Sequence, residues 1–294
     1  DIFLSFLPLC HIFERMAGYY TAVSCGAMIC YAESIEKIAQ NMTEIKPTVM
    51  TAVPRLFERM HSKIIKNVES QPEKKQKIFQ WALEVGKLYF EAGKDGRSIP
   101  IGLTIKHKLA DKLVFKKLRE RTGGRLRFFI SGGAALSRDL GEFFVSAGIK
   151  IIEGYGLTES SPVLSCNRLD DFKFGTVGKP FPGVEIKIAS DGEILAHGPN
   201  IMQGYYKNKK ETEATIKDGW LHTGDIGEID GNNYKSLKIY EVALFPLQEG
   251  VYTLESMIMK IETKNKDSSF KPKFKDLYNI SLLEATNSFC FASL

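Results

Sequence analysis

Residues 153–162 bring together side chains whose types and spacing suit nucleotide and metal chemistry. They read Glu-Gly-Tyr-Gly-Leu-Thr-Glu-Ser-Ser-Pro, and a short apolar run at 149–152 precedes them. We expect a strand that runs into a sharp turn and presents Tyr155, Thr158 and Glu159 together. An aromatic ring can stack on a flat base, a hydroxyl can donate to a phosphate oxygen, and a carboxylate can be one of the few protein ligands of Mg²⁺. The alternative interpretation is a strand end followed by a polar loop.

Other short motifs stand in a fixed order around this stretch. They are Leu-Pro-Leu-Cys-His at 7–11, Ser-Gly-Gly-Ala-Ala-Leu at 131–136, Gly-Thr-Val-Gly-Lys-Pro at 175–180, Gly-Glu-Ile-Leu at 192–195, Gly-Tyr-Tyr at 204–206 and Trp-Leu-His-Thr-Gly-Asp at 220–225. Their order and spacing over residues 1 to about 234 resemble the adenylate-forming superfamily. Within it, the sequence looks most like AMP-forming long-chain fatty-acid–CoA ligases.

The resemblance implies a two-step reaction that uses ATP, Mg²⁺ and CoA. A fatty-acid carboxylate attacks the α-phosphate of ATP to give an acyl-adenylate and pyrophosphate, and the thiol of CoA then displaces AMP. By resemblance, Tyr155 stacks on the base, Thr158 contacts the α-phosphate, Glu159 binds Mg²⁺ and Asp225 accepts from the ribose hydroxyls. Thr158 and Glu159 are thus the predicted catalytic residues. The full predicted nucleotide site is Gly133, Ala134, Ala135, Glu153, Gly154, Tyr155, Gly156, Leu157, Thr158 and Asp225.

Three aromatic residues in these motifs have competing interpretations. The resemblance places His11 beside the acyl pocket, although a lone histidine after a proline-terminated strand is usually a hydrogen-bonded structural residue. His222 can equally be a surface residue, and Trp220 is expected in a core rather than in contact with a ligand.

Some parts of the family pattern are missing from this sequence. The Ser/Thr/Gly-rich loop with its lysine, which cradles the β- and γ-phosphates, is absent, and Gly123-Gly124 and Gly132-Gly133 lack a following Lys-Ser/Thr. The hinge and the C-terminal domain with its catalytic lysine are not recognisable either. We therefore expect a truncated chain that is inactive by itself. The alternatives are a non-catalytic nucleotide- or acyl-binding remnant and an adenylating enzyme for another carboxylic acid.

The elements that must position these residues alternate between strands and helices. Apolar runs at 2–9, 27–31, 48–53, 126–130 and 149–152 predict strands, and helices are expected at 12–20, from Ser34 to about 41, over most of 55–121 and from Ser137 to Gly148. This alternation predicts an α/β fold of βαβ units, with a mostly parallel sheet flanked by helices. Binding loops are then expected at the C-terminal ends of the strands.

The residue pattern and composition of the sequence change twice along the chain. After Pro182, alternating apolar residues and an Asp191-Gly192 turn predict a hairpin, so 175–234 is interpreted as a small β-rich subdomain of the domain that begins at 1–174. From 235 to 294 there is no arginine and one glycine, against ten arginines and 24 glycines before. We expect a tail without family resemblance, distinct from the family's C-terminal domain.

Composition restricts the partners and the setting. The region from about 61 to 121 is a helical basic insert: from His61 to Arg127 there are 17 Lys or Arg and 7 Asp or Glu, which suits either a solvated helical face or peripheral contact with an anionic membrane. No nucleic-acid partner is expected. Five scattered cysteines without metal-ligand spacing favour reduced thiols and a cytoplasmic location, peripheral at a membrane if the insert binds one.

Overall fold

The described part of the chain comprises residues 1–93, 98–230 and 233–237 of a computed structural model. All of them belong to the first of two units, Asp1–Glu241. Most of the segment 235–294 lies outside the described residues, so its interpretation as an unrelated tail stays a prediction.

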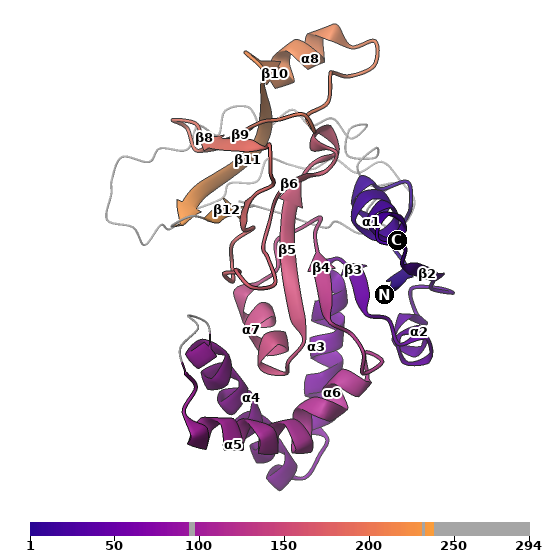
Figure 1. The fold of residues 1–294 in the computed structure, drawn as a ribbon, viewed down its shortest axis with the longest axis vertical. Helices are drawn as coiled ribbons and strands as arrows, with labels where there is room; N and C mark the ends of the chain where they lie inside the picture. Colours follow the sequence, from indigo (N-terminus) through magenta and orange to yellow (C-terminus); the bar gives the residue numbers. More distant parts are fainter. Residues whose placement is uncertain (94–97, 231–232, 238–294) are drawn as a thin grey trace, which may run out of the picture. The chain divides into compact units, whose positions relative to one another are not determined.

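A seven-stranded sheet forms the centre of the described chain (Figure 1). Its spatial order is β2-β1-β3-β4-β5-β6-β7, with the first five strands parallel and β6 and β7 antiparallel. This confirms the predicted mostly parallel sheet. The strands are β1 (Ile2–Ser5), β2 (Met28–Tyr31), β3 (Val49–Ala52), β4 (Phe128–Ser131), β5 (Lys150–Gly156), β6 (Val163–Cys166) and β7 (Lys179–Pro180).

Helices connect the parallel strands and cover the sheet. A π-helical segment η1 (Glu14–Tyr20) continues into α1 (Thr21–Ser24), and α2 (Ile38–Ile45) precedes β3. Four further segments lie between β3 and β4, where the basic helical insert was expected. They are α3 (Pro54–Glu69), α4 (Glu73–Gly93), α5 (Ile101–Ala110), and the pair η2 (Asp111–Phe115) and α6 (Lys116–Glu120); α7 (Arg138–Ser146) then joins β4 to β5.

Alternation along the strands gives the sheet two apolar faces. Leu4, Met50 and Phe129 are fully buried in a cluster that also includes residues of α2, α3 and α7. The neighbouring residues Phe3 and Val49 point to the opposite face, where they pack with Ala22 of α1. The central strands β1, β3 and β4 therefore bury both sides, as strands of a helix-flanked parallel sheet do.

A second, antiparallel sheet follows in the chain. It contains β8 (Glu185–Ile188), β9 (Glu193–His197), β10 (Ile216–Lys217), β11 (Trp220–Asp230) and β12 (Asn233–Leu237), with α8 (Lys209–Thr215) before β10. The predicted hairpin is present: β8 and β9 pair antiparallel, and Gly192 donates its amide hydrogen to the Ala189 carbonyl across the turn. This sheet is the predicted β-rich part of the fold.

Several predicted element boundaries were wrong. β1 ends at Ser5 rather than near residue 9, because the chain turns at Pro8, whose carbonyl accepts from the His11 amide. The helix predicted from Ser34 begins only at Ile38, and Ser34 instead closes a turn with Lys37. β5 does not end at residue 152 but continues through Gly156, because β6 pairs along its far end.

A buried carboxylate fills the crevice between β1 and β3. Strand order reverses there, which in open α/β sheets is the usual place for a ligand. Here the side chain of Glu14 is fully buried and accepts hydrogen bonds from Ser5 Oγ at 2.5 Å and from the Thr51 hydroxyl. Burial raises the pKa of Glu14, partly opposed by these two hydrogen bonds. The side chain of Glu14 thus occupies this crevice, and most of the predicted nucleotide-site residues lie at or just after the ends of β4 and β5 instead.

The described residues also include most of the cysteines and the helices that could be compared with a membrane span. Cys10, Cys25, Cys30 and Cys166 are free thiols, while Cys290 lies outside the described residues. Within the described ranges, no helix is both long enough and apolar enough to cross a membrane.

Candidate functional site

The end of β5 and the turn after it are held by a dense set of hydrogen bonds. The 3₁₀ turn η3 (Thr158–Ser160) follows the strand, and Ser160 Oγ accepts from the Leu157 amide at 2.9 Å. Asn200 Nδ2 donates to the Ser160 and Val163 carbonyls at 2.8 and 3.0 Å. The Met202 amide donates to the Glu159 carbonyl at 2.8 Å. The turn is therefore fixed from a segment 40 residues further along the chain.

Gly156 is required at this position by close backbone approach. A Cβ built on it would lie 1.7 Å from the Pro162 carbonyl oxygen and 2.6 Å from the carbonyl carbon. Nothing flexible occupies that space, so no side chain fits. A Cβ on Gly154, by contrast, would have its nearest neighbour at 3.6 Å. The two glycines of the motif differ in what they do for the fold.

A single hydrogen bond joins the two predicted halves of the nucleotide site. Tyr155 Oη donates to Asp225 Oδ2 at 2.8 Å, although the residues are 70 positions apart. Burial raises the pKa of Tyr155, so its hydroxyl remains a donor. The ring packs against the cluster of Leu164, Ala196 and Leu221. The predicted base-stacking ring and the predicted ribose-binding carboxylate are therefore neighbours.

Glu193 shapes the bulge of β11 that carries Asp225. The register of β11 against β9 shifts between His222 and Ile226. Glu193 Oε1 accepts from the Gly224 amide at 2.9 Å, while Oε2 lies 2.7 Å from His222 Nδ1. In the sequence, Glu193 is recognisable only as part of the motif at 192–195, and its role in the bulge was not predicted. His222 is partly buried in the pair rather than a free surface residue.

Thr223 supplies the remaining links in this bulge. Its hydroxyl donates to the Ile194 carbonyl at 2.7 Å and accepts from the Asp225 amide at 3.2 Å. Trp220, which was expected in a core, is only partly buried, and the Lys187 ammonium lies 3.7 Å from the centroid of its ring. Neither Thr223 nor Lys187 was a predicted site residue.

The loop after β4 lies beside β5 because the two strands pair in register, with Ser131 opposite Glu153. Gly133, Ala134 and Ala135 are exposed in this loop, and Gly133 has a left-handed φ of 79°. Small residues here leave backbone open to an approaching ligand. The structure thus brings this predicted part of the site next to the predicted part on β5.

The buried side chain of Glu153 holds the loop after β4 in place. Its side chain is 7% exposed, and Oε1 accepts from the Leu136 amide at 2.9 Å. Burial raises the pKa of Glu153 to about 7, although the hydrogen bond from the backbone partly offsets the effect. Its visible contact is therefore with protein backbone, and its predicted contact with nucleotide stays a prediction.

A cleft of about 300 Å³ opens beside the turn that carries Glu159. Glu159 Oε1 accepts a hydrogen bond of 2.8 Å from Tyr205 Oη, and burial followed by this bond raises the pKa of Tyr205. The exposed Thr158 neighbours Glu159 on the turn. The cleft is lined by Leu157, Glu159, Glu193, Tyr205, Glu211, Ala214, Thr215, Leu221, His222, Thr223 and Gly224.

The side chains around Glu159 suit a metal ion whose other ligands are substrate phosphates and water molecules. Among the described residues there is no group of three or more His, Cys, Asp or Glu side chains that could hold a metal ion. Mg²⁺, however, is commonly held by one or two carboxylates together with substrate phosphates and waters. One oxygen of Glu159 is engaged by Tyr205, which leaves the other without a hydrogen-bond partner among the described residues. This fits Mg²⁺ arriving with a nucleotide, and the assignment stays a prediction.

His11 lies away from these contacts. It is exposed, and its Nδ1 accepts from the Phe13 amide at 3.2 Å at the start of the helical segment. It does not line the cleft beside Glu159. This is the hydrogen-bonded structural arrangement considered above, and the acyl-pocket role stays a prediction.

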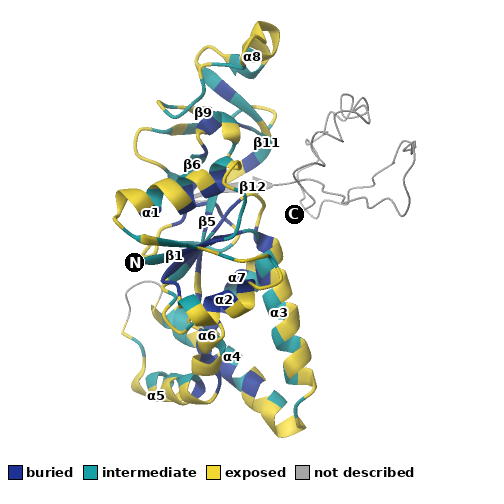
Figure 2. Cartoon of the chain, turned by 90° about the vertical axis from the view of Figure 1, so that its right-hand side faces the viewer, coloured by how far each residue is buried: buried dark blue, intermediate teal, exposed yellow. Residues whose placement is uncertain are grey.

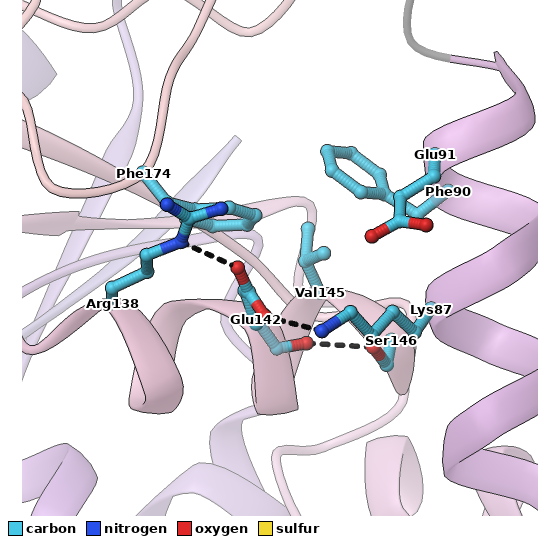
Figure 3. Close-up of a pocket in the computed structure, with 8 residues that line it drawn as sticks. All are labelled: Lys87, Phe90, Glu91, Arg138, Glu142, Val145, Ser146 and Phe174. Atoms are coloured by element: carbon cyan, nitrogen blue, oxygen red, sulfur yellow. Dashed lines mark hydrogen bonds and ion pairs between the residues drawn. The ribbon is translucent and has the colours of Figure 1, made fainter.

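A small pocket between α4 and α7 contains a second cluster of charges, which the sequence did not indicate (Figure 3). Glu142 of α7 is bonded to Arg138 Nε at 2.7 Å and to Lys87 Nζ of α4 at 3.0 Å. The hydrogen bonds from Arg138 and then Lys87 lower the pKa of Glu142. The pocket measures about 50 Å³, and three of its charged side chains, Lys87, Arg138 and Glu142, are paired with one another. It therefore links two helices rather than offering space for a substrate.

A protein-family model matches most of the described chain. The model of the family described as "AMP-binding enzyme" matches residues 1–206, which include β4, β5 and the turn after it. The chain belongs to the AMP-binding enzyme family. The resemblance inferred from the motifs is thereby confirmed.

Curated members of this family are similar over most of the chain. The long-chain-fatty-acid–CoA ligase FadD15 of Mycobacterium bovis is 37% identical over 237 residues, which cover 80% of this chain and 38% of the relative. The peroxisomal long chain acyl-CoA synthetase 6 of Arabidopsis thaliana is 34% identical over 300 residues, covering 96% of this chain and 41% of the relative. The chain thus spans about two fifths of the length of the curated relatives it matches.

Solved structures of AMP-binding enzymes share the fold. The N-terminal domain of FACL13 from Mycobacterium tuberculosis superposes with a TM-score of 0.56 at 19% sequence identity. The match covers 81% of this chain and 51% of that domain. At this identity the likeness supports the architecture, which agrees with the α/β fold described above.

Proposed function

We propose that this chain carries the adenylate-binding part of an enzyme that activates long-chain fatty acids with ATP. In the first step the fatty-acid carboxylate attacks the α-phosphate, which forms the acyl-adenylate and releases pyrophosphate. In the second step the CoA thiol attacks the acyl carbonyl, and AMP leaves as the thioester forms. The observation that carries the proposal is the 2.8 Å hydrogen bond between Tyr155 and Asp225, because it joins the motif at 153–162, which lies within the residues that the family model matches, to the motif at 220–225.

The nucleotide roles are those that the resemblance implies, and the positions of the side chains support them. Tyr155 stacks on adenine, and Asp225 accepts from the ribose hydroxyls. The bulge held by Glu193 supports this arrangement, because it fixes Asp225 beside the tyrosine hydroxyl. The open loop at 133–135 lines the adenine and ribose, and Thr158 donates to the α-phosphate from its exposed place on the turn. Such preorganised donors lower the barrier where negative charge develops.

Glu159 is proposed to hold the Mg²⁺ that accompanies ATP. Its half-buried place at the cleft and its single protein partner, Tyr205, support this role. A magnesium ion there would neutralise charge on the nucleotide phosphates. The resulting expectation is that Glu159→Gln weakens binding of ATP with Mg²⁺ more than binding of AMP without metal.

The proposal also includes a long-chain acyl group and a cytoplasmic location. The long-chain preference is supported by the names of the relatives, such as the fatty-acid–CoA ligase of M. bovis. His11 is proposed to lie at the acyl pocket through its place in the motif at 7–11, and the free cysteines support a cytoplasmic setting.

A stable mimic of the acyl-adenylate tests the proposal without requiring turnover. The chain is titrated by calorimetry with sulfamoyl-adenosine carrying a palmitoyl, an acetyl or a benzoyl group. The palmitoyl compound is expected to bind at least about tenfold more tightly than the other two, since each buried methylene adds affinity. Asp225→Asn should weaken all three, whereas Glu142→Gln at the α4–α7 ion pair should weaken none. Equal affinity for the three compounds would contradict the long-chain assignment, and no binding of any would contradict the adenylate site.

A further inference from the structure

A row of large apolar side chains lies exposed along α5 and η2. Ile101, Ile105, Leu109 and Leu113 are 80%, 62%, 49% and 42% exposed, and they recur every four residues along the helical segment. Residues with this spacing lie along one side of a helix. Figure 2 shows the outward surface of α5 as largely exposed. Single exposed apolar residues need no explanation, but four in a row do.

The opposite side of the same segment is already used by the fold. Ala110, Val114 and Phe115 are buried in the cluster that joins α4, α5 and η2. The ring of His107 stacks on Tyr89 of α4 at 3.9 Å between centroids. The helix is therefore apolar on two sides, and only one of them has a partner among the described residues.

Lysines surround the exposed row. Lys106, Lys108, Lys112, Lys116 and Lys117 are all exposed, and no ion pair joins any of them to a carboxylate within the part of the chain that the structure describes.

The acidic residue in this segment does not offset them. The Asp111 carboxylate lies 2.7 Å from the Arg119 guanidinium and is already neutralised. On an ideal helix at 100° per residue, Lys108 and Lys106 fall on either side of the apolar row, and Lys112 falls within it. The row is thus an apolar stripe flanked and interrupted by lysines, and the exposed Glu120 at the end of α6 offsets the charge of one of them.

A second exposed apolar patch on the same chain has a different composition. Tyr19, Tyr20, Val23, Met28 and Tyr31 are 36% to 61% exposed around α1 and β2. No lysine occurs from residue 1 to 36. Tyrosine and methionine without lysine are typical of protein–protein interfaces. Leucine and isoleucine flanked by lysines are typical of helices that lie in a membrane interface.

We propose that α5 and η2 dock on an anionic lipid membrane. The row Ile101, Ile105, Leu109 and Leu113 enters the boundary between headgroups and acyl chains, and the lysines contact lipid phosphates and carboxylates. Charge complementarity favours this occupant over a second copy of the chain, because two copies would bring like charges together. The proposal goes beyond acyl activation and does not depend on it.

Vesicle flotation of the full 294-residue chain tests the proposal. Vesicles of phosphatidylcholine with about a third phosphatidylserine are compared with phosphatidylcholine alone. The chain should float with the anionic vesicles and bind the neutral ones much more weakly. Ile105→Ser with Leu109→Ser should abolish flotation, and since the two residues are 62% and 49% exposed the fold should survive. Circular dichroism checks that it does.

The charge contribution is tested with a matched pair of triple variants. Since each lysine near an anionic surface gives roughly a fivefold gain in affinity, Lys108→Gln, Lys112→Gln and Lys116→Gln together should weaken binding by about a hundredfold. The same change at Lys209, Lys210 and Lys217, also exposed, removes equal charge elsewhere and should have little effect.

Three outcomes would overturn the proposal. The first is no flotation with anionic vesicles, and the second is flotation that survives the Ile105 and Leu109 substitutions. The third is a dimer that forms in their absence and is lost with them, without vesicle binding, which would assign the stripe to a second copy of the chain. Titration with the adenylate mimic reports separately on the proposed function, so failure of one does not imply failure of the other.

Discussion

Replacing Glu153 by glutamine should change how the stability of the chain depends on pH. The carboxyl is 7% exposed, and burial raises its pKa from the ordinary 4.5 to about 7. Between these two values the folded chain keeps a proton that the unfolded chain releases. Stability is therefore full below about pH 4.5 and falls as the pH rises to about 7.

The magnitude follows from the width of that window. Each pH unit over which only the folded state holds the proton is worth about 1.4 kcal/mol, so Glu153 should cost the folded chain about 3 kcal/mol by pH ~8. Glutamine does not titrate, and its carbonyl oxygen can still accept from the Leu136 amide. The partly buried neighbour Cys166 has a pKa raised to about 11, by burial and then by the charge of Glu153, so it does not titrate in this range.

Urea unfolding at about pH 5 and about pH 8, followed by tryptophan fluorescence, measures the difference. The unfolding free energy of Glu153→Gln relative to wild type should rise by about 3 kcal/mol between the two conditions. Glu142→Gln is the matched control: the pKa of Glu142 is lowered, so its effect changes only below about pH 4.5. If wild type and Glu153→Gln kept the same pH dependence, the buried carboxyl would not be ionising in this window and the reasoning would be refuted.

Four further substitutions test the local geometry. Gly156→Ala should prevent folding or cost several kcal/mol, because its Cβ would lie 1.7 Å from a carbonyl oxygen. Gly154→Ala, whose Cβ would have its nearest neighbour at 3.6 Å, should leave stability unchanged or raise it by up to about 1 kcal/mol. Urea unfolding compares the two variants, and similar costs would contradict the backbone argument. Tyr155→Phe loses one hydrogen bond of about 1 kcal/mol but keeps the ring, so the affinity for AMP should fall only several-fold. Calorimetry measures this affinity, and complete loss of AMP binding would show that stacking is not the main contribution. Glu193→Ala removes the acceptor for the Gly224 amide and should weaken AMP binding although Glu193 is not a proposed ligand; unchanged affinity would mean that the bulge does not position the site.

The features that the sequence predicted best are those with a local cause. The cap at Ser137 is present, since its hydroxyl accepts from the Leu140 amide at 3.3 Å, and Pro54 occupies the first turn of α3. Alternation of apolar residues predicted the hairpin of β8 and β9. Such signals act over a few residues, so one sequence is enough to reveal them.

The features that escaped prediction depend on partners far apart in the chain. Asn200 ties down the turn after β5, and Glu193 holds the bulge that carries Asp225, yet neither side chain differs locally from any polar residue on a strand or loop. The extension of β5 through Gly156 arises from pairing with β6, which two glycines in the strand obscured. Long-range hydrogen bonds leave no periodic pattern, so only the folded chain shows them.

A crystal structure of the chain soaked with AMP would test the central claim most directly. We predict that the adenine lies against the ring of Tyr155 and that the ribose hydroxyls lie within hydrogen-bonding distance of Asp225. The α-phosphate should then reach the turn that carries Thr158 and Glu159. AMP bound elsewhere, or a crystal in which Tyr155 and Asp225 contact only each other at saturating AMP, would contradict the account.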